Sequence, residues 1–87
     1  MNLNQNKIMY KNAIDILNDA ISYLVPHTLN LGKPIPNSET KTAHVQIGKD
    51  NFELHINPDF EAAVNEFDYA FILAHETMHV LLGHLLV

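Results

Sequence analysis

The sequence contains no cysteine and no arginine, and each absence excludes a class of function. Without cysteine there can be neither a disulfide framework nor a thiolate zinc site, so any metal must be held by imidazole, carboxylate or water. Five lysines stand against ten acidic residues, which gives a formal charge of −5. Nucleic-acid binding needs a basic surface and favours arginine, so this composition argues against it. The six histidines become the main candidates for chemistry.

A chain of 87 residues has room for one small domain with one core. Hydrophobic residues make up 47% and charged residues 17% of it, a composition typical of globular rather than disordered chains. The N-terminus lacks the charged start, apolar block and small-residue cleavage site of a signal peptide, so we predict a cytoplasmic protein.

The N-terminal third indicates a helix followed by a loop. Between about residues 4 and 25, apolar side chains recur every three or four positions, which predicts an amphipathic helix that Pro26 ends. Residues 27–42 then contain Gly32 and two prolines among polar side chains, which indicates a loop of roughly fifteen residues, long enough for a functional role.

Two runs of alternating apolar and polar residues, 44–47 and 52–56, predict a β-hairpin that turns at residues 49–50. With that turn, Val45 lies opposite Leu54, and all the apolar side chains of the hairpin share one face. Moving the turn by one residue would keep the same alternation of faces.

Three of the six histidines precede the predicted helices of the second half of the chain. His44 and His55 fall on the polar face of the predicted hairpin, where they can lie opposite each other. A solvated strand face is the commoner outcome there, and a second metal site is the alternative. His27 directly follows a helix-ending proline, so we interpret it as a partner of the helix C-terminal dipole or a solvent residue, without function.

Two asparagines indicate helix starts in the second half of the chain. Asn57 precedes a proline and predicts a short helix through Val64, and Asn65 predicts a main helix from about Glu66 to the end. That helix is apolar nearly all round, which indicates burial on several sides or a membrane. Glu76 and three histidines within it make a membrane span too costly.

His75, Glu76 and His79 form an HExxH motif on this predicted helix. Histidines four apart lie about 40° from each other and one turn apart in height, so both imidazoles can reach one ion. Imidazole without sulfur favours zinc, although copper or nickel can compete. Glu76 is placed to accept a proton from water activated by the ion. An HExxH sequence can arise by chance. However, burying its three polar side chains in an apolar helix without a bound cation would cost much free energy of desolvation.

His84 is the candidate for a third metal ligand. It lies five residues after His79, about 140° around a straight helix, so it faces away unless the backbone breaks at Gly83. Glycine readily takes the left-handed conformation that ends a helix. Two interpretations stay open: either His84 completes a three-histidine site beyond the break, or Gly83 only permits close packing and His84 is a surface residue.

Residues 43–84, which include INPDFEAAVNEFDYAFILAHETMHVLLGH, resemble a metallopeptidase-like domain of bacterial and phage proteins, often found ahead of a von Willebrand factor A-like domain. The shared pattern is a hairpin, an asparagine-proline followed by an aromatic, a short acidic helix and an active helix LAHExxHxxLGH. The resemblance implies that His75 and His79 are metal ligands, that Glu76 is the catalytic base and that His84 is a further ligand. It also implies a zincin-like sheet whose edge strand holds an extended peptide. Leu82 stands where the long metzincin signature has glycine, so the chain is not a metzincin.

These observations predict an α+β fold over residues 1–87, made of an N-terminal helix, a β-hairpin, a short helix and a C-terminal HExxH helix in a minimal zincin-like core. The predicted function is zinc-dependent hydrolysis of a peptide or protein substrate. The alternatives are an inactive metal-binding module for interaction or dimerisation, and a structural helical fragment without metal. The apolar end of the main helix predicts cover from a second copy or from a missing C-terminal segment, so we expect the N-terminal fragment of a larger domain.

Overall fold

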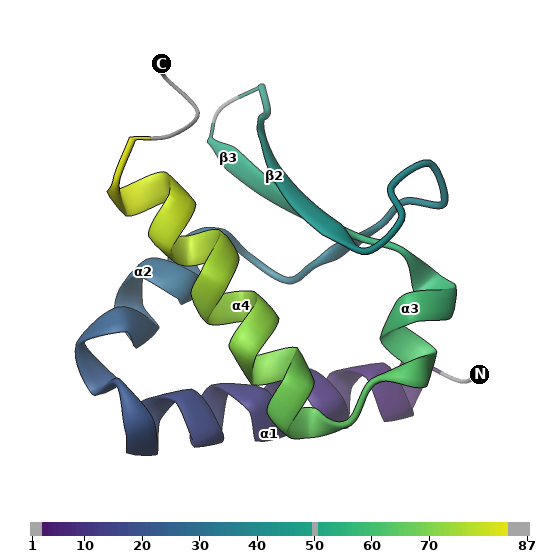
Figure 1. Cartoon of the computed structure of the whole chain (residues 1–87), viewed down its shortest axis with the longest axis horizontal. Coiled ribbons are helices and arrows are strands. Elements are labelled where there is room, and N and C mark those ends of the chain that lie inside the picture. The colour runs from purple at the N-terminus through teal and green to yellow at the C-terminus, as the bar shows by residue number, and fades with distance from the viewer. Residues whose placement is uncertain (1–2, 50, 84–87) are drawn as a thin grey trace.

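The computed structural model describes residues 3–49 and 51–83, and these residues form a mixed α+β fold (Figure 1). They build four α-helices, one short 3-10 helix and a three-stranded sheet. In chain order the elements are α1 (Leu3–Ala20), η1 (Ser22–Leu24), α2 (Val25–Asn30), β1 (Ile35–Pro36), β2 (Ala43–Ile47), β3 (Phe52–Ile56), α3 (Pro58–Ala63) and α4 (Glu66–Leu81). The predicted α+β class is confirmed, while the zincin-like identity of the fold stays a prediction.

The N-terminal helix is shorter than predicted, because Pro26 begins a helix instead of ending one. Helix α1 stops at Ala20, the chain bends at Ile21, and Pro26 lies in the first turn of α2. A proline is tolerated there because the first N–H groups of a helix have no partner within the helix. The predicted continuous helix to about residue 25 was therefore wrong.

The segment predicted as one long loop contains two elements. Its first residues belong to α2, and Ile35 and Pro36 form the short strand β1, which pairs in parallel with β3. The sheet order is β1-β3-β2, so β1 is an edge strand, where a proline without an N–H costs little. A strand of two residues is too short to show an alternating pattern. Its pairing with residues 20 positions later in the chain could therefore not be predicted from the sequence.

The hairpin has the predicted register. Val45 lies opposite Leu54 and Ile47 lies opposite Phe52. The Gly48 N–H donates to the Asn51 carbonyl at 2.7 Å and closes the turn. Val45 and Leu54 are buried, as expected for the apolar face.

Both predicted helix caps are present. The Asn57 side chain accepts hydrogen bonds from the N–H groups of Asp59 and Phe60 at 2.8 and 3.1 Å, and the Asn65 side chain accepts from the N–H of Asp68 at 2.8 Å. At its other end α4 stops at Leu81 rather than running to the end of the chain.

Helix α4 lies between the arm formed by α1 and α2 and the sheet (Figure 1). It packs against α1, β2 and α2, so the predicted burial on several sides is confirmed, while Phe67 and Phe71 are 65% and 71% exposed. None of the helices in the described ranges combines the length and apolar character needed to cross a bilayer. The buried core comprises Ala13, Leu31, Val45, Leu54, Ile56, Tyr69, Ala70 and Leu73.

Candidate metal centre

His75, Glu76 and His79 come together on one side of α4, as their spacing predicted. One ligand atom from each lies within 4.8 Å of the other two. The Nε2 atoms of His75 and His79 are 3.0 Å apart, and the two rings meet nearly at right angles, at 85°. Two ring nitrogens this close can share a single proton or face a common cation. The donor set of two imidazoles and a carboxylate, without sulfur, suits a borderline divalent ion such as zinc.

The carboxylate of Glu76 is held between α4 and the sheet. Only 9% of this residue is exposed. The backbone N–H of Val45 on β2 donates a hydrogen bond to the carboxylate. Burial raises the pKa of Glu76 above its ordinary value, while His79, His75, His44 and the Val45 N–H oppose that rise. A raised pKa makes the carboxylate a better proton acceptor near neutral pH.

Strand β2 presents the edge of the sheet to this triad. In the antiparallel ladder, the Gly48 N–H bonds Asn51 at one end and the Asn57 N–H bonds the Thr42 carbonyl at the other. Because such bonds alternate along a strand, the N–H and C=O groups of Val45 point away from β3. That direction agrees with the hydrogen bond from Val45 to Glu76. The backbone groups of residues 43 and 47 share this direction.

A cleft of about 350 Å³ lies where this edge faces α4. Glu76 and His75 form part of its wall, together with the start of β2 and one side chain of α3. The other residues that line it are Thr42, Ala43, Phe60, Phe71 and Ile72. The candidate metal ligands therefore open onto a space beside a strand edge rather than onto flat surface.

His84 lies outside the described residues, so the structure places only three of the four predicted site residues. Gly83, which is described, has a φ of 73°, in the left-handed region that the first of the two open interpretations requires. The chain thus leaves the helical path of α4 directly before His84. His27 is exposed on α2 and lies in its last turn.

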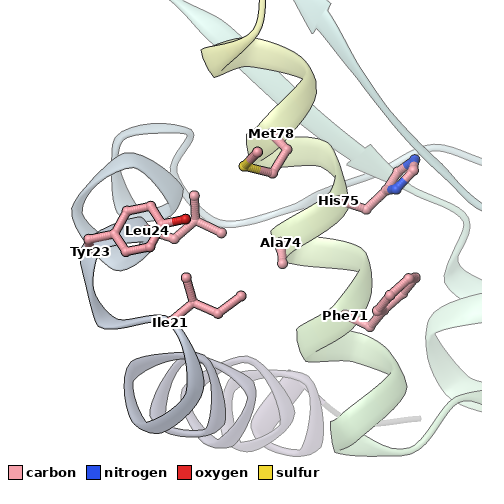
Figure 2. Close-up of a pocket in the computed structure, with 7 residues that line it drawn as sticks. All are labelled: Ile21, Tyr23, Leu24, Phe71, Ala74, His75 and Met78. Atoms are coloured by element: carbon pink, nitrogen blue, oxygen red, sulfur yellow. The ribbon is translucent and has the colours of Figure 1, made fainter.

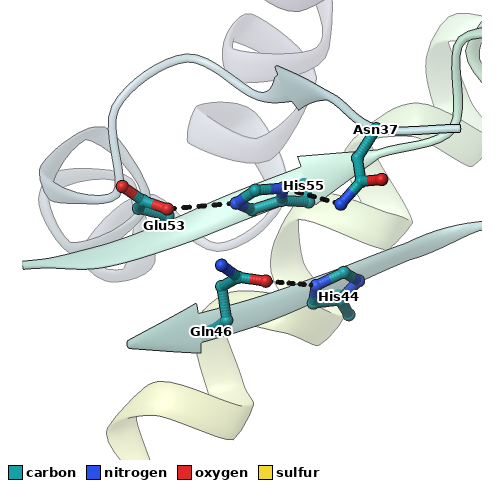
Figure 3. Close-up of polar contacts among 5 residues, drawn as sticks. All are labelled: Asn37, His44, Gln46, Glu53 and His55. Carbon is teal, nitrogen blue, oxygen red and sulfur yellow. Dashed lines mark hydrogen bonds and ion pairs between the residues drawn. The ribbon is translucent and has the colours of Figure 1, made fainter. Parts of the chain in front are cut away.

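His44 and His55 do lie opposite each other, with stacked rings 5.2 Å apart (Figure 3). The Asn37 amide donates to Nδ1 of His55 at 3.1 Å, and Nε2 of His55 bonds Glu53 at 3.1 Å. Both ring nitrogens of His55 are therefore engaged, which disfavours a second metal site. His55 is 9% exposed, so the expectation of a solvated strand face was wrong for this residue. Strand β1 brings Asn37 to it, and the sequence alone gave no sign of that pairing.

Sequence reasoning missed two contributors to the site. The sequence predicts Val45 only as a side chain on the apolar face of the hairpin, whereas its backbone N–H also bonds Glu76. Phe71 was counted as a buried helix residue, yet it is exposed and its ring stacks with that of His75 at 6.3 Å. The spacing of four residues between Phe71 and His75 was the available signal, since such pairs are neighbours on a helix surface.

Comparison with known proteins yields no relative. No protein-family model, no curated protein and no solved structure matches this chain. The assignment of the site therefore depends on its own residues and geometry.

Proposed function

We propose that this protein is a zinc-dependent metallopeptidase with a zincin-like core. The observation that carries the proposal is the triad on α4, in which the Nε2 atoms of His75 and His79 are 3.0 Å apart and Glu76 lies next to them.

His75 and His79 would hold the ion, with His84 as a further ligand. The left-handed φ of Gly83 supports the role of His84, because it turns the chain out of the helix just before that residue. When bound, a zinc ion supplies Lewis-acid polarisation of a carbonyl and lowers the pKa of water.

Glu76 would act as the general base. Its carboxylate accepts the N–H of Val45, which fixes its orientation, and burial raises its pKa, which favours proton uptake. The remaining outward backbone groups of β2, at Ala43 and Ile47, are free to pair with an extended peptide by strand addition. Such pairing would lay the peptide along the cleft that Glu76 and His75 line.

The test compares the full chain with its Glu76→Gln variant after both are loaded with zinc. Gln keeps the size of the side chain and a hydrogen-bond acceptor but removes the base. We expect the two proteins to bind zinc equally and only the wild type to cleave a mixture of unstructured peptides, as followed by mass spectrometry. Equal cleavage by both proteins would refute the role of Glu76. Absence of cleavage by zinc-loaded wild type would refute the peptidase function.

A second candidate is a catalytically inactive metal-binding module for interaction or dimerisation. The supporting observation is a set of exposed apolar side chains at or near α4, namely Phe67, Phe71, Met78, Leu81 and Leu82. Exposed apolar groups gathered on one helix are typical of association surfaces. Sedimentation of the zinc-loaded protein distinguishes the candidates: a homodimer without cleavage supports the module, and an active monomer refutes it.

A further inference from the structure

An apolar pocket of about 310 Å³ adjoins the candidate metal centre at His75 (Figure 2). One wall comes from the chain between α1 and α2, and the other comes from α4. In Figure 2 Ala74 lies on the α4 wall, and the side chain of His75 projects from the other side of that helix, away from the opposite wall. The remaining lining residues are Ile21, Tyr23, Leu24, Phe71 and Met78. The break in the N-terminal helix at Ile21 therefore creates one wall of the pocket.

The pocket and the cleft along β2 meet at two shared residues. Phe71 and His75 line both spaces, and their rings stack 6.3 Å apart at an angle of 24°. The two residues therefore form the ridge between the cleft and the pocket, and a side chain of a peptide in the cleft would cross this ridge to enter the pocket.

The residues that line the pocket disfavour the entry of a charged side chain. Apart from His75, every residue that lines the pocket is uncharged, and most are aliphatic or aromatic. A lysine or glutamate side chain placed there would lose water without gaining a partner, which is costly. An apolar side chain would instead remove exposed surface from water on both sides, because Tyr23 and Phe71 are each 71% exposed.

We propose that this pocket is the specificity site for one large apolar side chain, such as leucine, methionine or phenylalanine, of the peptide substrate. The proposal rests on the proposed peptidase function and adds the class of residue next to the cleaved bond. The occupant is a side chain of the peptide, because the pocket of about 310 Å³ shares Phe71 and His75 with the cleft in which the peptide would lie.

The experiment measures the binding of two probes to the zinc-loaded full chain, without relying on catalysis. The probes are N-acetyl-leucine hydroxamate and N-acetyl-glycine hydroxamate, which share a metal-chelating group and differ only in the side chain. We expect the leucine probe to bind at least about 10- to 200-fold more tightly, the range that a single methylene produces in an apolar pocket. Amide chemical-shift changes should locate the leucine side chain at Leu24, Ala74 and Met78.

Two variants locate the effect. Tyr23→Ala removes a wall of the pocket without touching the triad, and should bring the affinity ratio of the two probes down toward one. Leu29→Ala is the matched control, because Leu29 is 52% exposed on the adjoining α2 and does not line the pocket. The ratio in this control should equal that of the wild type. Thermal unfolding of each variant verifies that it is folded.

Each outcome decides one of the two proposals. Equal zinc-dependent binding of both probes overturns the pocket and leaves the metal site intact. If neither hydroxamate binds through zinc, the metal function fails. In that case leucine-specific shifts at Leu24 and Ala74 still support an apolar side-chain site, and their absence overturns it. Shifts at these residues that depend on protein concentration alone would show that a second copy occupies the pocket, which also overturns the proposal.

Discussion

Thr28 and Thr77 are 49 residues apart in the chain, and their hydroxyl oxygens lie 2.7 Å apart in the buried interior. Thr77 donates to the Leu73 carbonyl at 2.6 Å, while Thr28 lies 3.3 Å from the Leu24 carbonyl. Two hydroxyl protons cannot serve three bonds, so the shorter distances favour Thr28 donating to Thr77 and Thr77 donating to Leu73. This pair joins α2 to α4 next to Glu76, and so connects the N-terminal arm to the candidate metal centre.

The threonine pair predicts coupled stability effects. Thr28→Val and Thr77→Val should each lower the free energy of unfolding by about 1 to 3 kcal/mol, because each leaves a buried hydroxyl with a lost partner. The double variant should cost less than the sum, since it removes both hydroxyls together. Urea denaturation of the four proteins measures the coupling. Strict additivity would contradict the bond between the two hydroxyls.

Loss of either histidine of the triad should abolish tight zinc binding. His75→Ala and His79→Ala each remove one of two imidazoles that converge on a point, so we expect affinity to fall by more than the roughly 10- to 100-fold typical of outer-shell changes. Isothermal titration with zinc gives the affinities. His27→Ala is the control, because His27 is exposed on α2, away from the triad. An equal loss in that control would mean that the ion binds elsewhere.

His84→Ala tests the third ligand separately. Since Gly83 turns the chain out of α4, we expect this variant to bind zinc more weakly than the wild type while its thermal unfolding without metal is unchanged. His27→Ala, which changes an exposed histidine on α2, should retain the wild-type affinity. Unchanged affinity in His84→Ala would remove His84 from the site and leave His75 and His79 as the ligands.

The pKa of Glu76 predicts how stability of the metal-free protein depends on pH. Burial raises this pKa above the ordinary 4.5, so the folded state favours the protonated carboxyl. The free energy of unfolding that protonated Glu76 contributes is fully present at a pH below the ordinary pKa. It is lost as the pH rises through the raised pKa of the folded state. Glu76→Gln should therefore be more stable than the wild type at neutral pH, and the difference should disappear in acid. Urea denaturation in the presence of a chelator at several pH values measures it, and a wild type that is equally stable at neutral pH would contradict it.

Local chemistry explains what could be predicted from the sequence. The caps at Asn57 and Asn65 depend on neighbouring residues, and the hairpin register follows from the alternation of side chains around a short turn. The pair His75 and His79 depends only on helical spacing. Each of these features depends only on residues that are close together in the chain.

Long-range pairings explain what could not be predicted. The sequence predicts that Pro26 ends a helix, whereas it starts α2, because the chain bends at Ile21 and α2 packs on α4. The burial of His55 depends on Asn37, which arrives through a two-residue strand. The contact of Glu76 with β2 uses the backbone N–H of Val45. Every residue except proline has this group, so the identity of residue 45 could not indicate the contact.

Tyr69 and Glu61 provide a last prediction, on how α4 is anchored at its start. The Tyr69 hydroxyl donates to the Glu61 carboxylate at 2.8 Å, and both residues are buried. Tyr69→Phe should lower the free energy of unfolding by about 1 to 3 kcal/mol, because it leaves the Glu61 carboxylate without this donor. Glu61→Gln should cost less, since its amide oxygen still accepts the bond.

The same pair sets the alkaline limit of stability. Burial, and after it the bond to Glu61, raises the pKa of Tyr69 above the ordinary 10.0. The stability that depends on its proton is present below that value and is lost as the pH rises beyond it. The wild type should therefore lose its advantage over Tyr69→Phe in strong alkali, as followed by urea denaturation between neutral pH and about pH 11. A constant difference over that range would contradict the dependence of this contribution on the proton of the Tyr69 hydroxyl.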